Sequence, residues 1–284
     1  MYLRLSLAML AFVGNSILCR LALKQTQIDA ASFTLIRILG GAIVLALLML
    51  LRGRFSRRSG SWAGGLALAV YATAFSFAYL HLEAGTGALL LFGAVQLCMI
   101  AWGAINGEKL ALAHVLGIVL ACCGIVVLLL PGASAPPMAY AALMILSGLA
   151  WGVYSLLGRG GEAPEQSTAG NFARALLMVG VFCLPMLPSM NWDAAGVTYA
   201  VISGGLASGV GYVLWYGAVR SLSRISAAVV QLSVPCLTGI AGYLFLDEVL
   251  TARLLLASAA VLGGIGLVLR AGQDRPARPA SRKI

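Results

Sequence analysis

The chain has 284 residues, of which 61% are hydrophobic and only 10% are charged. Soluble domains carry about 25% charged residues, so this chain has too few charges to cover a water-soluble globule of its size. Its net charge of +10 is compatible with nucleic-acid binding, but the positions of the basic residues argue against that function.

Apolar segments of about 20 residues, the length that crosses a bilayer core of about 30 Å, recur along the whole chain. Charged or turn-forming stretches such as RGRFSRR, PGASAPP and GRGGEAPEQS separate them. A transmembrane β-barrel would alternate polar and apolar residues, and these segments do not. We therefore predict an all-α integral membrane protein with ten transmembrane helices, at residues 3–23, 31–51, 62–81, 86–105, 111–130, 138–158, 168–188, 196–219, 225–246 and 251–270.

The basic residues indicate how the chain is oriented. If both termini are cytoplasmic, 14 of the 19 basic residues fall in cytoplasmic loops, helix ends or the tail, as the positive-inside rule predicts. The first apolar segment is long, contains Arg20 and lacks a signal-peptide cleavage site, so it is read as the first helix. We expect a multi-pass protein of the inner (plasma) membrane, with residues 272–284 as a basic cytoplasmic tail near the lipid surface.

The chain contains an internal repeat. A shift of 140 residues places GGLA (64–67) on GGLA (204–207) and Glu108 on Glu248. Each half has five predicted helices, an odd number, so the second half enters the membrane in the opposite direction. We expect two inverted repeats, residues 1–135 and 136–271, an arrangement typical of secondary transporters whose site lies between the halves.

The acidic residues are expected to serve structure. Glu108 and Glu248 precede the helices at 111–130 and 251–270, where the positive end of a helix dipole favours a carboxylate by about 0.3–1 kcal/mol. We interpret both as structural turn residues. None of the nine acidic residues lies in the middle of a span, whereas a proton-coupled exporter of cationic drugs would be expected to bury one. A neutral or zwitterionic substrate, such as an amino acid, and facilitated or weakly coupled flux are therefore favoured.

Two stretches of the second half carry a family resemblance. SVPCLTGIAGYLFLDEVLT (233–251) and LSGLAWGVYSLLGR (146–159) resemble the EamA-type transporters of the drug/metabolite transporter superfamily, and the resemblance extends over essentially the whole chain. The first half departs from the pattern, with Val95 where Pro235 stands in the second half and Val13-Gly14-Asn15 where a tryptophan is usual. The resemblance implies transport of small metabolites, such as amino acids, nucleotide sugars or drugs, through a central cavity lined by helices 1, 3, 4, 6, 8 and 9.

Polar and aromatic side chains inside the spans are the candidates for that cavity, because lipid offers them no partner. Packing is the alternative for the aromatic residues, and a hydrogen bond to a neighbouring helix is the alternative for Asn and Gln. Pro235 removes one backbone hydrogen bond from its helix and is expected to act as a conformational hinge. The predicted substrate-binding residues are Asn15, Tyr79, Gln96, Trp151, Tyr154, Tyr212, Trp215 and Gln231.

Arg37 and Arg174 are cations within spans, at corresponding positions of the two halves. Either could contact a substrate carboxylate, but we favour extension of both side chains to the membrane surface. His81 and His114 are interpreted as structural. The six cysteines lie in apolar segments without zinc-ligand spacing, so no metal and no cofactor are expected.

The leading hypothesis is a secondary transporter of small metabolites, with amino acids foremost and export as the direction. A multidrug or nucleotide-sugar transporter is the nearest alternative. A membrane-embedded enzyme would need polar residues gathered at one membrane face, and a membrane assembly protein would not need the polar residues within the spans. The expected partners are a small-molecule substrate and the lipid bilayer, without nucleic acid, and a monomer is sufficient.

Overall fold

The computed structural model describes residues 2–54, 56, 59–107, 111–132, 135–158, 164–219 and 230–273, and this part of the chain is helical without strands. Glu108 and residues 274–284 of the predicted tail lie outside these ranges. The elements are α1 (Tyr2–Gln25), α2 (Ala30–Leu51), α3 (Trp62–Ala78), α4 (Ala84–Ile105), α5 (Leu112–Leu129), α6 (Met138–Leu157), α7 (Pro164–Cys183), the 3₁₀-helix η2 (Leu184–Ser189), α8 (Ala194–Ile202), the π-helix η3 (Ser203–Val210), α9 (Gly211–Val219), α11 (Ser233–Leu246) and α12 (Ala252–Gln273).

The prediction of ten apolar helices is confirmed. Among the described residues, eight spans are long and apolar enough to cross a membrane when α7 is counted with η2, and α8 with η3 and α9. The helices α3 and α11 are shorter but equally apolar. The chain is therefore an all-helical, multi-pass membrane protein.

Two helix boundaries differ from the prediction in ways that matter for function. Helix α3 ends at Ala78, so Tyr79 and His81 lie in the turn before α4. In the predicted helix 225–246, the described residues are interrupted by a turn at Leu232, and α11 begins at Ser233. Pro235 lacks the N–H that would bond the carbonyl of Gln231, and a proline is tolerated in the first turn of a helix, where the N–H groups have no helical partner. Pro235 thus lies in the first turn of α11 rather than at a bend in its middle.

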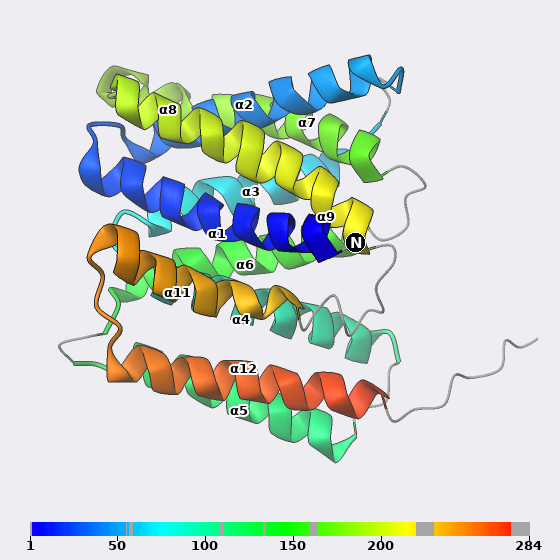
Figure 1. The fold of residues 1–284 in the computed structure, drawn as a ribbon, viewed down its shortest axis with the longest axis vertical. Coiled ribbons are helices and arrows are strands. Elements are labelled where there is room, and N and C mark those ends of the chain that lie inside the picture. The colour runs from blue at the N-terminus through cyan, green and yellow to red at the C-terminus, as the bar shows by residue number, and fades with distance from the viewer. Residues whose placement is uncertain are drawn as a thin grey trace, which may run out of the picture.

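The helices run roughly parallel in one bundle (Figure 1). Helices α5 and α12 pack against each other at one edge of the bundle, and α2 packs against α7 and η3 at the other. The chain begins in α1 and leaves α12 at the same end of the bundle, which we call the terminal end. The other end, where α1 is followed by α2 and α11 by α12, is called the opposite end.

Glycines bring two pairs of helices into close contact across the halves of the chain. A Cβ atom on Gly117 of α5 would lie 2.4 Å from the carbonyl oxygen of Gly264 in α12, and one on Gly204 of η3 would lie 1.9 Å from the carbonyl oxygen of Arg37 in α2. Since lipid supplies little hydrophobic force between helices, such close packing is a main source of association in membranes. Both contacts join the first half of the chain to the second.

Candidate functional site

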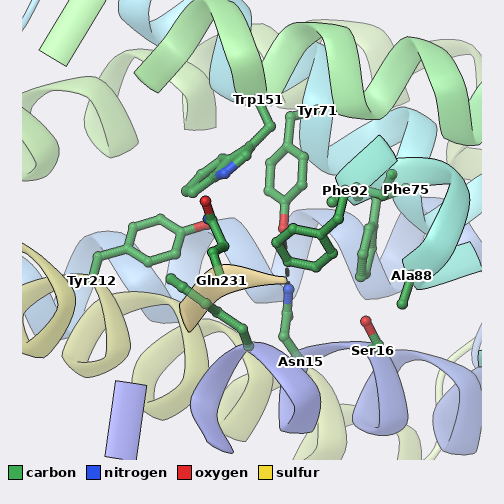
Figure 2. A pocket seen from close by; sticks show the side chains of 11 residues that line it. Asn15, Ser16, Tyr71, Phe75, Ala88, Phe92, Trp151, Tyr212 and Gln231 are labelled. Carbon is green, nitrogen blue, oxygen red and sulfur yellow. Dashed lines mark hydrogen bonds between the residues drawn. The ribbon is translucent and has the colours of Figure 1, made fainter. Parts of the chain in front are cut away.

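A small cavity lies in the centre of the bundle, between α1, α3, α4, α6 and α9 (Figure 2). Its volume is about 20 Å³, which is space for about one water molecule. A metabolite enters this space only if the helices around it move apart. The cavity is lined by Phe12, Asn15, Ser16, Tyr71, Phe75, Ala88, Leu91, Phe92, Trp151, Tyr212 and Gln231.

Four of the predicted binding residues line this cavity: Asn15, Trp151, Tyr212 and Gln231. Figure 2 shows Gln231 reaching toward Trp151 and Tyr212 on one side, while Asn15 points toward the hydroxyl group of Tyr71 on the other. All four side chains are buried. The cavity therefore combines two amides with a set of aromatic rings.

The other four predicted binding residues do not line the cavity. The hydroxyl of Tyr79 donates to the carbonyl of Ala84 at 3.2 Å, because Tyr79 lies beyond the end of α3, two helical turns from Tyr71. The remaining three are Gln96, which is buried in α4, Tyr154, whose hydroxyl donates to Thr168 at 3.4 Å, and Trp215, whose ring packs 5.7 Å from that of Phe12.

A chain of buried hydrogen bonds forms the polar side of the cavity. The hydroxyl oxygen of Tyr71 accepts from Asn15 Nδ2 at 3.1 Å and from Arg37 Nη2 at 3.0 Å. Asn15 Oδ1 accepts from the hydroxyl of Ser203 at 2.7 Å. The network therefore connects α1, α2 and α3 of the first half to η3 of the second.

Aromatic rings form the opposite side. The ring of Trp151 lies 4.9 Å from that of Tyr71, 5.0 Å from that of Tyr212 and 5.3 Å from that of Tyr154, measured between centroids. Phe12 packs edge-on against Tyr212 at 6.2 Å. The contact between Trp151 and Tyr154 is stacked and the others are tilted or edge-on, geometries that aromatic pairs favour. The rings of this wall therefore stabilise one another.

Arg37 does not extend to the membrane surface, and the prediction that it does is wrong. Its side chain is 1% exposed, and it stands seven residues into α2, about 10 Å along the helix at about 1.5 Å per residue. The guanidinium carbon lies 4.8 Å from the ring centroid of Phe75 and 5.3 Å from that of Tyr71. These aromatic faces hold the cation inside the bundle by cation–π attraction.

Arg174, the counterpart in the second half, contacts residues at the terminal end, where α3 begins. Its Nη1 donates to the carbonyl oxygens of Ser59 at 2.7 Å and Gly170 at 2.9 Å, and its guanidinium covers the ring of Trp62. The two arginines that the repeat pairs in sequence therefore have different surroundings.

Charged side chains connect several helices at the opposite end of the bundle. Arg20 Nε lies 3.2 Å from Glu248 Oε1, and Arg20 Nη1 donates to the carbonyls of Tyr79 and Leu80 at 2.9 and 3.1 Å. Lys24 Nζ donates to the carbonyl of Leu246 at 2.7 Å. These bonds tie α1 to the ends of α3 and α11.

The sequence suggested that Glu248 caps α12. It does lie in the turn before α12, but its carboxylate caps another helix. Its Oε2 accepts from the backbone N–H of Ala84 at 2.7 Å, so the carboxylate caps α4 of the first half. The chain turns sharply at Asp247, which has a positive φ of 53°, and this turn brings the carboxylate back toward α4. The carboxylate of Glu248 therefore interacts with the N-terminus of α4 instead of the expected N-terminus of α12.

The histidines take part in local packing. The ring of His81 packs at a tilt against that of Tyr140, with 4.1 Å between the centroids, and His114 Nδ1 accepts from the backbone N–H of Ala111 at 3.2 Å. Within the described ranges, no three His, Cys, Asp or Glu side chains come together in a way that could hold a metal ion.

A larger groove of about 390 Å³ lies between α3, α6 and α7. Its walls are apolar apart from one threonine, so it offers no polar recognition comparable to the central cavity. The groove is lined by Leu66, Ala69, Val70, Thr73, Ala74, Phe77, Leu143, Leu146, Met178, Val179 and Phe182.

The π-helix η3 and the hydrogen bond of Ser203 were not predicted from the sequence, although the pair Gly204-Gly205 indicated a close approach of two helices. Ser203 begins η3, and its hydroxyl donates to Asn15. Gly204 allows η3 to approach the backbone of Arg37 in α2. π-Helical segments are rare and frequently lie at functional sites. In the sequence, the Ser-Gly-Gly stretch at 203–205 indicates this contact, since glycines inside a span permit close helix packing.

The sequence profile of the EamA-like transporter family matches residues 138–270. An uncharacterized protein of Pseudomonas aeruginosa is 54% identical over 273 residues, which are 96% of this chain and 95% of the relative. A protein of Streptantibioticus cattleyicolor named probable terminal-alkyne amino-acid exporter is 26% identical over 78% of this chain and 76% of its own. A solved crystal structure with 20% identity has the same fold, with a TM-score of 0.69 over 96% of this chain and 98% of that one.

Proposed function

The chain belongs to the EamA-like transporter family, and on this premise we propose that it exports small metabolites, with amino acids as the leading class, by alternating access. The observation that carries the proposal is the central cavity, which is lined by helices from both halves and holds polar groups that lipid would not satisfy. The cavity is about 20 Å³ in volume, so we assign the structure to a closed conformation in which substrate is excluded.

Alternating access requires that one end of the bundle opens while the other closes. The bonds of Arg20 and Glu248 close the opposite end by joining α1 and α4 to the turn before α12. We propose that residues 1–135 and 136–271 are inverted repeats that rock against each other, and that these bonds break when the opposite end opens. Pro235 is retained as the proposed hinge, because it lies in the first turn of α11, next to the turn at Leu232 that separates this helix from Gln231 of the cavity.

The lining suggests how a substrate would be held. Trp151 and Tyr212 offer ring faces to an apolar body, and Asn15 and Gln231 offer amides to a polar group. We propose these four as substrate-binding residues. For Tyr79, Gln96, Tyr154 and Trp215 we propose contact with substrate only when the helices separate.

An amino acid suits this combination, and a relative is named an exporter of one kind of amino acid. A cationic drug suits it less well, because Arg37 is buried beside Tyr71 and Phe75 of the cavity wall and would repel a second cation.

The proposed orientation places the terminal end in the cytoplasm of a cell whose inner membrane holds the protein. Among the described residues, Arg4, Arg52, Arg54 and Arg270 lie toward this end, as the positive-inside rule requires. One chain supplies both sides of the proposed pathway, so a monomer is sufficient for transport.

Counterflow in proteoliposomes tests the proposal. Vesicles preloaded with single unlabelled amino acids should accumulate at least one labelled amino acid. Trp151→Phe, which changes a residue of the cavity wall, should reduce the rate several-fold. Trp102→Phe, which changes an exposed tryptophan of α4 outside the wall, is the matched control and should leave the rate unchanged. Absence of accumulation for every amino acid in correctly folded wild-type protein would overturn amino-acid transport.

A further inference from the structure

The guanidinium of Arg37 is a buried cation without an acidic partner in the described part of the chain. The ion pairs found there are Arg20 with Glu248 and Arg52 with Glu165. Taking a charge out of water is unfavourable unless it is paired, and more so inside a membrane. The rings of Phe75 and Tyr71 offset part of this cost, but they do not supply a negative charge.

Several hydrogen-bond donors beside the cavity are also unused. Arginine has five N–H donors, and Arg37 directs Nη2 to the hydroxyl of Tyr71, while Nε and Nη1 have no hydrogen-bond partner. The hydroxyl of Tyr212, which lines the cavity, is likewise buried without a partner. Buried polar groups are nearly always paired, so these atoms indicate a ligand position.

Access to Arg37 from the cavity is controlled by one side chain. Tyr71 lines the cavity, and its hydroxyl oxygen already accepts from both Arg37 and Asn15. A rotation of the Tyr71 ring away from α2 would expose the guanidinium to the cavity and release Asn15 Nδ2 as a further donor. In the closed conformation the hydroxyl oxygen of Tyr71 therefore stands where an acceptor oxygen of a ligand would be.

From this geometry we infer that Arg37 is the recognition site for a carboxylate of the transported substrate, an inference that rests on the proposed function. A carboxylate fits the fork of a guanidinium with two parallel hydrogen bonds. The hydroxyl of Tyr212 and the amide of Asn15 complete the site, and the rings of Trp151 and Phe92 receive the apolar body. A single buried cation balances one negative charge, which favours a carboxylate over a doubly charged phosphate.

The test uses probes that share a benzene ring and differ in charge. They are phenylalanine, its amide, 3-phenylpropionate and phenyl phosphate, and each is scored by its inhibition of counterflow and by its effect on the Tm of the purified full-length chain. We expect phenylalanine and 3-phenylpropionate to bind wild-type protein about ten-fold or more tightly than the amide, as charge-assisted hydrogen bonds imply.

Variants test whether Arg37, and not another charged residue, causes the preference of the protein for carboxylate probes. Arg37→Gln should abolish the preference for the two carboxylates over the amide, and Arg37→Lys should restore part of it. Arg174→Gln, which changes the arginine at the terminal end, should leave the preference unchanged. The wild-type ranking of probes tests the inference even if Arg37→Gln does not fold.

The outcomes distinguish this inference from the proposed function. If labelled amino acids are transported but the amide binds wild-type protein as tightly as the carboxylates, or if Arg37→Gln keeps the preference, the assignment of Arg37 is wrong and transport stands. Tighter binding of phenyl phosphate than of 3-phenylpropionate would overturn the carboxylate assignment. If no labelled amino acid is transported and no probe binds, both proposals fall.

Discussion

Arg20 and Glu248 are 228 residues apart in sequence, and an ion pair of 3.2 Å between Nε and Oε1 joins them at the opposite end of the bundle. Arg20 belongs to α1 in the first half, and Glu248 precedes α12 in the second. Because both side chains are largely buried, at 12% and 7% exposure, removing one member of the pair leaves a buried charge without a partner and costs more than breaking a surface salt bridge. Under the proposed alternating-access mechanism, the pair joins the two halves at the end that must separate when the opposite end opens.

Replacing Glu248 with Gln should open this end more often. The amide can still accept from the N–H of Ala84, but Arg20 loses its charge partner, and removing one member of a buried pair typically costs about 3 kcal/mol. In a variant that keeps Cys19, which is buried in α1 next to Arg20, as the only cysteine, a membrane-impermeant maleimide should label Cys19 faster after Glu248→Gln.

The matched control is Glu165→Gln, which removes the ion pair with Arg52 near the terminal end, where the side chains are 25% and 44% exposed. Surface pairs contribute about 0–1 kcal/mol, so labelling of Cys19 should not change. Equal labelling rates in wild-type and Glu248→Gln protein would show that the ion pair does not hold this end closed.

The contact between α2 and η3 predicts a large difference between two glycines of the same span. A methyl group at Gly204 would lie 1.9 Å from the carbonyl oxygen of Arg37, whereas one at Gly217 of α9 would meet no atom within 4 Å. Gly204→Ala should therefore lower the Tm in detergent markedly and move the backbone that carries Arg37. Gly217→Ala should leave the Tm unchanged or raise it, since alanine is favoured over glycine in a helix by about 1 kcal/mol. Similar Tm values for the two variants would contradict the close packing of η3 on α2.

Hydropathy predicted the helical fold well, because ten apolar segments separated by charged or turn-forming stretches leave few other architectures in a membrane. It did not show which face of each helix turns inward. In these spans nearly every face is apolar, so Tyr79 was selected from the sequence, whereas Tyr71, which lies two helical turns earlier and lines the cavity, was missed. The end of α3 at Ala78 separates them, and that end depends on contacts with α1 and α4.

Arg37 shows a second limit of the sequence. A span arginine about 10 Å from a helix end can either extend to the membrane surface or turn inward, and its own sequence neighbours are compatible with both. The rings of Phe75 and Tyr71, which belong to another helix, decide the outcome. For the same reason the position of Glu248 in a turn was predictable, while its contact with Ala84 was not.

Removal of the Tyr71 hydroxyl should lower the free energy of unfolding more than removal of the Ser203 hydroxyl. Tyr71→Phe leaves two buried donors, Asn15 Nδ2 and Arg37 Nη2, without their acceptor, at about 1–3 kcal/mol each. Ser203→Ala removes one donor from Asn15 Oδ1 and should cost less. Thermal unfolding of the two variants in the same detergent measures the difference, and an equal or larger loss for Ser203→Ala would show that the network is not centred on Tyr71.

The stability of the opposite end should depend on the protonation of Glu83. This residue precedes α4 and makes no side-chain capping bond, and burial together with the nearby carboxylate of Glu248 raises the pKa of Glu83 above its ordinary value of 4.5, although Arg20 and Lys24 act against the shift. A carboxyl group whose pKa is raised by folding stabilises the folded state when protonated. This contribution is complete below pH 4.5 and is lost as the pH rises through the pKa of the folded state.

Glu83→Gln fixes the side chain in a neutral form and should remove this dependence. The Tm of the variant should therefore match that of wild-type protein near pH 4.5 and exceed it increasingly as the pH rises toward 7. Glu165→Gln serves as the control, because Glu165 pairs with Arg52 at the terminal end, far from Glu248. If the difference in Tm between Glu83→Gln and wild-type protein stays constant with pH, protonation of Glu83 does not stabilise the closed opposite end. Repulsion between the carboxylates of Glu83 and Glu248 would then have no part in opening the bundle.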